Sequence, residues 1–122
     1  MIQIKKIIIA YETTQDLVKD SGLSINAKWS LFKLRKKLYP HYEFHVTESR
    51  NLFLSYKTEV DGNTVTFESV DLANEYQKKQ DEIDNFEIDE DIEKIKLKLS
   101  DIPGITIPQM EQLEEFVEFS PE

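Results

Sequence analysis

Two histidines four residues apart are the sharpest candidate for chemistry in this sequence. On a helix, His41 and His45 would share one face, where two imidazoles can bind a common metal ion. The metalloprotease pattern requires a glutamate directly after the first histidine, but Tyr42 occupies that position, and only Glu48 suggests itself as a further ligand. The competing interpretation is that both histidines are polar residues beside a break in the helix. A metal-dependent enzyme using His41 and His45 is therefore the least favoured of three functional hypotheses.

Other reactive groups are scarce. The absence of cysteine excludes disulfides, thiolate catalysis and cysteine-based metal sites. The three glycines are isolated at positions 22, 62 and 104, so they form no phosphate-binding loop or dinucleotide fingerprint. With 24 Asp and Glu among 122 residues, carboxylate pairs are expected by chance and do not indicate acid–base catalysis. We therefore expect a protein that is not an enzyme and that uses no cofactor, bound metal or small-molecule substrate.

Charge is unevenly distributed along the chain. Residues 1–60 contain ten Lys and Arg against six Asp and Glu, whereas residues 61–122 contain five against eighteen, so the halves carry net charges of +4 and −13. Such a division is typical of interaction surfaces. The phosphate backbone of a nucleic acid would be repelled by most of this molecule, which disfavours direct nucleic-acid binding.

Two stretches account for much of this division, namely a basic patch at 28–37 and an acidic run at 81–93. They either satisfy each other within one fold, where a surface ion pair contributes about 0–1 kcal/mol, or they meet a partner or a second copy of the chain. The sequence leaves these alternatives open. The candidate partner-binding residues are Lys28, Trp29, Lys33, Lys36, Lys37, Asp84, Glu87, Asp89, Glu90, Asp91 and Glu93.

Trp29 is the single tryptophan of the chain, and Phe32 follows it by one helical turn. Tryptophan supplies a large contact area at low entropic cost, so an exposed Trp29 would be a binding anchor. The alternative is that both rings belong to the core. Trp29 lies off the apolar stripe of its own helix, which keeps the interface interpretation open.

The elements that must position these residues follow from apolar periodicity, which predicts a helix-rich α+β fold. A first helix is predicted at about 5–19. A second helical pattern runs over about 24–57 and contains Pro40, which must end or kink it, so we expect one long kinked helix or two abutting helices. The apolar positions that should face the core are Ala27, Leu31, Leu34 and Leu38.

Short alternating segments predict a small sheet, with strands near 2–4, 64–67, 94–99 and 116–119. A narrow apolar stripe after Ser69 predicts a surface helix, and Pro108 can open a short helix near the end of the chain. Isolated apolar residues within the acidic run at 81–93 suit an extended segment with one buried side. Because no linker or internal repeat divides the chain, we expect a single domain over 1–122.

The longest apolar run is Ile7–Ala10, far short of the roughly 20 residues that a membrane span requires. It also lacks the longer apolar core and the cleavage site of a signal peptide. We therefore expect a cytoplasmic protein without a membrane partner.

Several segments, in this order, are similar to a family of short phage and prophage proteins of unknown function. The similarity rests on pattern and spacing over most of the chain and includes no catalytic motif. It implies a phage origin, with the host cytoplasm or the virion as location, and it transfers no functional residue. The segments that carry it are Glu48–Leu52, Tyr56, Asp61–Asn63, Thr64–Phe67, Asn74–Lys79, Phe86–Ile88, Ile95–Leu97 and Met110–Phe116.

The first functional hypothesis is a non-enzymatic phage protein that binds a protein partner, as a virion or assembly component or as an accessory factor in the infected cell. Self-association is included in this hypothesis. The alternative is an inhibitor of a host nucleic-acid enzyme or defence system, in which the acidic run at 81–93 imitates a phosphate backbone.

Overall fold

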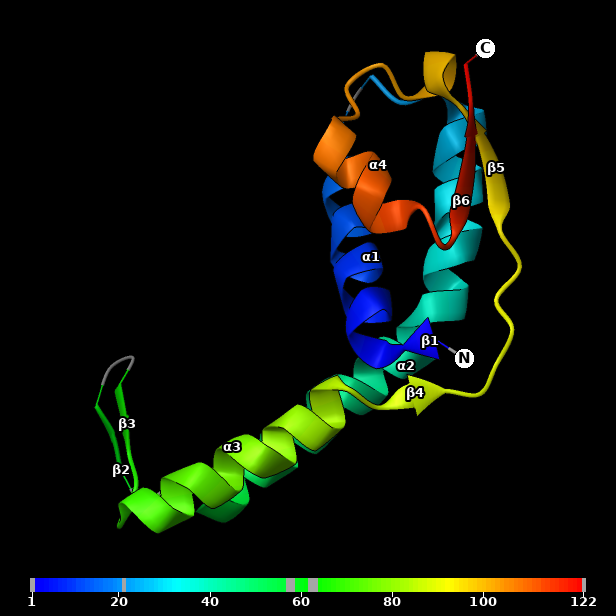
Figure 1. The fold of residues 1–122 in the computed structure, drawn as a ribbon. Helices are drawn as coiled ribbons and strands as arrows, with labels where there is room; N and C mark the ends of the chain where they lie inside the picture. Colours follow the sequence, from blue (N-terminus) through cyan, green and yellow to red (C-terminus); the bar gives the residue numbers. More distant parts are fainter. Residues whose placement is uncertain (1, 21, 57–58, 62–63, 122) are drawn as a thin grey trace.

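A computed structural model describes residues 2–20, 22–56, 59–61 and 64–121, and it shows a body from which a two-helix arm projects (Figure 1). The bend in the second helix divides body from arm. The helix-rich α+β class predicted from the sequence is confirmed. The helical elements are α1 (Ile4–Leu17), α2 (Ile25–Tyr56), α3 (Val70–Asp84), the 3-10 turn η1 (Leu99–Asp101) and α4 (Ile107–Leu113).

The strands are short and pair two by two. β1 pairs with β4 and β2 with β3 in antiparallel register, whereas β5 and β6 run parallel. The four segments predicted as strands correspond to β1, β3, β5 and β6, and the other two strands complete the pairs. The bounds are β1 (Ile2–Gln3), β2 (Glu59–Asp61), β3 (Thr64–Thr66), β4 (Glu87–Ile88), β5 (Ile95–Lys98) and β6 (Val117–Ser120).

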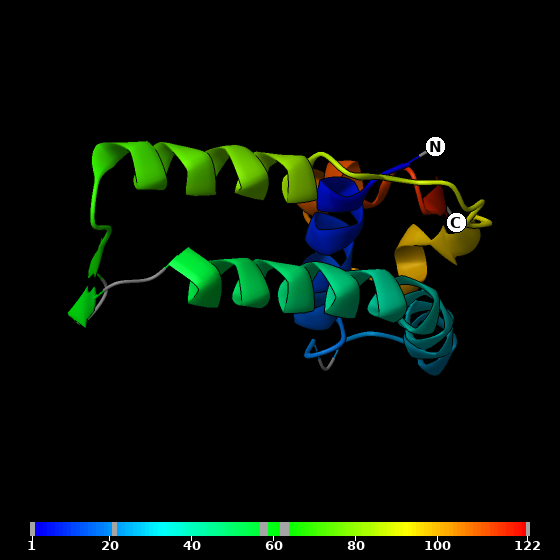
Figure 2. The ribbon, with the colours of Figure 1, turned by 90° about the horizontal axis from the view of Figure 1, so that it is seen from below.

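Helix α2 is the long kinked helix that the sequence predicts. The hydroxyl of Ser24 accepts a hydrogen bond from the backbone N–H of Ala27 at 3.1 Å, which satisfies one of the free donors at the start of the helix. Pro40 lies inside the helix, where it has no N–H to donate and its ring crowds the preceding turn. Figure 2 shows the two halves of α2 running in different directions.

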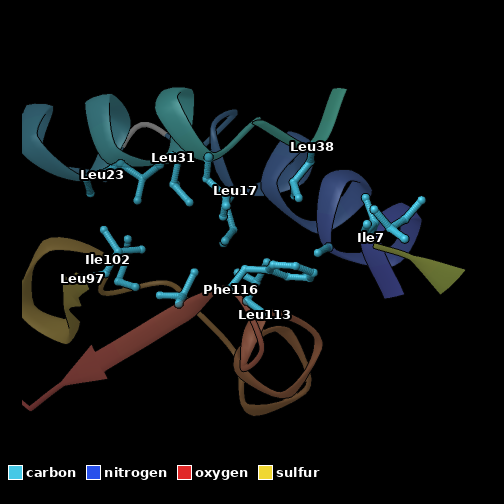
Figure 3. Packing of buried hydrophobic residues seen from close by; sticks show 14 of the residues in the cluster. Ile7, Leu17, Leu23, Leu31, Leu38, Leu97, Ile102, Leu113 and Phe116 are labelled. Carbon is cyan, nitrogen blue, oxygen red and sulfur yellow. The ribbon is translucent and has the colours of Figure 1, made fainter. Parts of the chain in front are cut away.

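The buried hydrophobic residues of the described chain all lie in the body. Helix α1, the first half of α2, α4 and the β5–β6 pair direct their apolar side chains toward one another (Figure 3), with Phe116 fully buried at the centre. All four predicted core positions of α2 are buried. In the arm, by contrast, none of the described side chains of residues 41–56 and 66–84 is fully buried. These described residues of the arm therefore form no core of their own.

The expectation that residues 81–93 are extended throughout is wrong for its first part, because α3 continues to Asp84. Gln80 and Asp84 extend the face of α3 that contacts α2, through hydrogen bonds to Ser49 and His45. The side chain of Asn85 then donates to the carbonyl of Asp81 and closes the helix. Tertiary contact with α2 thus extends α3 into the acidic run.

None of the helices in the described part of the chain is both long and apolar enough to cross a membrane.

Replacing a buried residue of α2 should destabilise the fold far more than replacing an exposed one beside it. Leu34 is fully buried, so Leu34→Ala should lower the free energy of unfolding by about 2–5 kcal/mol through lost burial and the cavity left behind. Phe32→Ala, two residues away, removes a 48% exposed ring and should cost much less. Urea denaturation followed by circular dichroism measures both. Equal losses for the two variants would contradict the described core.

Candidate protein-interaction surfaces

The first half of α2 carries a second apolar stripe that faces away from the core. Ile25, Trp29, Phe32 and Tyr39 are 78%, 58%, 48% and 47% exposed. Together with Lys36 they are spaced by four, three, four and three residues, which places them on one face of the helix. We call these five residues the α2 stripe. A helix face with this spacing is suited to packing against another helix.

Lysine side chains surround the α2 stripe. The ammonium of Lys33 lies 5.9 Å from the centre of the Trp29 ring, and that of Lys36 lies 5.6 Å from the Phe32 ring. The Trp29 and Phe32 rings stack at a centroid distance of 5.6 Å. No Asp or Glu occurs between Ile25 and Pro40, so all the charged residues that this segment contributes to the face are basic.

Arg35 also belongs to the basic patch, but it turns toward α1. Its guanidinium lies 5.1 Å from the centre of the Tyr11 ring and donates a hydrogen bond of 3.4 Å to the Tyr11 hydroxyl. The Nε atom is buried and has no hydrogen-bond partner among the described residues. Tyr11 is further held by stacking on Tyr42 at 4.4 Å. Arg35 therefore connects α1 to α2 and contributes little to the outward-facing charge.

A charged cleft shows how the basic patch and the acidic run are related. It has a volume of about 460 Å³ and brings one end of the patch against the segment between β4 and β5. The two halves of the charge division thus approach each other within one chain. No ion pair joins them among the described residues, and Lys28 and Lys33 lie outside the cleft. The cleft is lined by Lys36, Lys37, Pro40, Glu90, Asp91, Ile92 and Glu93.

The two histidines fasten the acidic run to α2. Nε2 of His41 lies 2.8 Å from Glu90, and Nε2 of His45 lies 2.8 Å from Asp84. Since an ionised carboxylate only accepts hydrogen bonds, each Nε2 is the donor. Each imidazole has a separate carboxylate, and the described residues contain no group of three or more His, Asp or Glu side chains able to hold a metal ion. The geometry therefore indicates that His41 and His45 hold the acidic run against α2.

The remaining candidate residues of the acidic run are spread over different elements. Glu87 belongs to β4, where it is paired in register with Gln3 of β1. Asp89 is exposed in the segment that follows. The candidate carboxylates of the acidic run thus lie on α3, on β4 and in the segment that follows β4.

A groove lies along the arm between α2 and α3. Its volume is about 400 Å³, and Phe44 and Phe86 close one end with their rings 5.9 Å apart. Leu52 and Ile83 supply further apolar surface. We call this the arm groove. Its polar lining residues are Glu48, Asn51, Ser55, Lys79 and Glu82.

The charge of Lys79 in the arm groove is compensated by its neighbours. Its ammonium donates a 2.7 Å hydrogen bond to the Tyr56 hydroxyl and lies 3.5 Å from the Glu75 carboxylate. These contacts raise the pKa of Lys79, mainly through Tyr56. Neither Glu48 nor Glu82 forms an ion pair within the described part of the chain. The groove therefore presents two uncompensated carboxylates beside apolar side chains.

Sequence reasoning missed Ile25 and Tyr39 of the α2 stripe. The sequence contained a signal for both. Positions 25, 29, 32 and 36 repeat the spacing of the buried positions 27, 31, 34 and 38 two residues earlier in the chain, and Tyr39 continues the four-and-three spacing by one step. The arm groove was also missed. It requires the pairing of α2 with α3, which no local pattern specifies.

Substitution of Tyr56 should change the pH dependence of stability. Its hydroxyl donates a 2.7 Å hydrogen bond to Glu75 and is the main cause that lowers the pKa of this carboxyl. A lowered pKa contributes stability above the ordinary carboxyl value of about 4.3, and this contribution is lost as pH falls through the lowered value. Tyr56→Phe should therefore raise the pKa of Glu75 and destabilise the chain more at pH 7 than in acid.

Carboxyl NMR titration of Glu75 and urea denaturation across pH measure these effects. Tyr76→Phe is the matched control, because the Tyr76 hydroxyl has no hydrogen-bond partner in the described part of the chain. A Glu75 titration curve that is the same in Tyr56→Phe and in the unchanged chain would contradict the assigned hydrogen bond.

Comparison of the chain with protein-family models, with curated proteins and with solved structures found no match.

Proposed function

We propose that this chain is a non-enzymatic protein-binding module whose α2 stripe docks on an acidic, partly apolar surface of a protein partner. The observation that carries the proposal is the stripe itself. Four large apolar side chains are exposed in helical register within a segment that contains lysines and no acid. Contiguous exposed apolar area of this kind is typical of interaction sites.

Trp29 is the expected anchor of the interface. Tryptophan is enriched among the few residues that carry most of the binding free energy, and these residues lie near the centre of an interface. Trp29 lies within the stripe, between Ile25 and Phe32, and is 58% exposed. Lysines at the rim would add selectivity and a faster association rate toward an acidic partner.

The spacing favours a protein over a nucleic acid as partner. A repeat of four and three residues matches the ridges of a packed helix, whereas single-stranded nucleic acids require a groove that tracks the phosphate backbone together with stacked bases. The net charge of the chain, −9, would also repel phosphates outside the immediate contact.

The alternative proposal, an imitation of a nucleic-acid backbone by the acidic run, has less support. The carboxylates lie on α3, on β4 and in the following segment, and Asp84 and Glu90 are engaged by histidines. A metal-dependent enzyme has less support still, since His41 and His45 face different carboxylates.

The family resemblance supplies a setting for this function. In a phage, the module would serve as a virion or assembly component or as an accessory factor in the infected cell. Mass spectrometry of purified virions separates the two roles, because a stoichiometric amount in the virion excludes a purely accessory role.

Binding of a synthetic acidic helix tests the proposal. The probe is a peptide of about three heptads with leucine at the a and d positions and glutamate at e and g. Isothermal titration calorimetry should detect binding that weakens with salt, because the lysines at the rim contribute through screened attraction. Trp29→Ala should weaken it by about 2 kcal/mol, which is roughly 30-fold in Kd.

Leu54→Ala is the matched control, because Leu54 is 56% exposed on the same helix but lies outside the α2 stripe and the arm groove. It should leave the affinity unchanged. Equal affinity for a peptide with lysine at e and g would contradict the proposal. Preferential binding of single-stranded oligothymidine would also contradict it and would indicate a nucleic-acid-binding surface.

A further inference from the structure

We infer that the arm groove is the docking site for the α2 stripe of a second copy of this chain, so that copies associate head to tail. The inference rests on the proposed function and names the partner of the stripe. It starts from the arm, in which none of the described side chains of residues 41–56 and 66–84 is fully buried. Two helices with half-buried apolar faces are stabilised when a third element covers them.

The two surfaces have complementary shapes. The α2 stripe is the convex face of one helix, and the arm groove is the concave seam between two antiparallel helices. A helix laid in such a seam places large side chains at intervals of three and four residues into the cavity. Trp29 and Phe32, one turn apart and stacked on each other, would fill a cavity of about 400 Å³.

The two surfaces also have complementary charge. Lys28 and Lys33 flank the stripe outside the charged cleft and form no ion pair with the described residues. Glu48 and Glu82 line the groove and are likewise unpaired in the described part of the chain. Docking of stripe on groove would bring unlike charges together around an apolar centre, which is the arrangement that gives an interface its selectivity.

Other pairings of these surfaces are disfavoured. The stripe and the groove involve the same helix on opposite sides of Pro40, so one chain cannot place its own stripe in its own groove unless α2 folds back on itself. A twofold contact of stripe on stripe would oppose lysines to lysines, and groove on groove would oppose Glu48 and Glu82 to their own copies. Like charges placed together make both arrangements unfavourable.

A head-to-tail contact uses two different surfaces of each copy. A head-to-tail pair as a whole leaves one stripe and one groove free, so association continues until it closes as a ring or extends as a filament. The assembly should therefore grow with protein concentration.

Two variants test the inference, each of which changes exposed side chains of one surface. The stripe variant combines Trp29→Ala and Phe32→Ala and so removes the two stacked rings of the stripe. The groove variant combines Glu48→Lys and Glu82→Lys and so reverses the charge of the two carboxylates in the groove. In sedimentation velocity from about 10 μM to about 1 mM, the unchanged chain should form species that grow with concentration. Each variant alone should remain monomeric.

Mixing the two variants is the decisive measurement. The stripe variant keeps an intact groove and the groove variant keeps an intact stripe, so the mixture should form a one-to-one heterodimer and nothing larger. Circular dichroism confirms that both variants are folded, and Leu54→Ala should assemble like the unchanged chain. Two folded variants that do not combine, or an unchanged chain that is monomeric throughout, would overturn the inference. Binding of the acidic peptide in that case would leave the proposed function standing.

Discussion

The missing backbone N–H of Pro40 is the constraint on which the rest of the structure depends. Without that donor, and with the proline ring against the preceding turn, α2 bends in its middle. The half before Pro40 packs into the body and the half after it forms the arm with α3. His41 and His45 come directly after the bend and contact Glu90 and Asp84. These contacts hold the acidic run against α2 where α2 changes direction.

The body and the arm differ in how they bury apolar surface. In the body, Leu31, Leu34 and Leu38 pack against α1 and the C-terminal elements, and this burial of about 1.5–3 kcal/mol per large side chain accounts for a stable core. The arm consists of two helices and the β2–β3 pair, and none of its described side chains at 41–56 and 66–84 is fully buried. The α2 stripe and the arm groove are apolar surfaces that stay accessible in the single chain.

The charged side chains also fall into two groups, those compensated within one chain and those left uncompensated. Within the described residues, the acidic run contributes carboxylates to two histidine contacts and to the cleft beside Lys36 and Lys37. Lys28 and Lys33, beside Trp29, remain outside that compensation. The uncompensated lysines of the basic patch are thus those beside an exposed aromatic ring. Positive charge and exposed apolar area therefore occur on the same surface of α2.

The sequence by itself determined the features that local chemistry controls. Helical spacing predicted the buried face of α2, Pro40 predicted its kink, and β-alternation predicted the four strand segments, because each depends on residues close in the chain. Tertiary structure decided the rest. Whether Trp29 was core or surface depended on which face of α2 met α1, and the helical state of residues 81–84 depended on contacts with Ser49 and His45. The arm groove exists only because α3 returns alongside α2, and such pairing depends on residues far apart in sequence that no local pattern records.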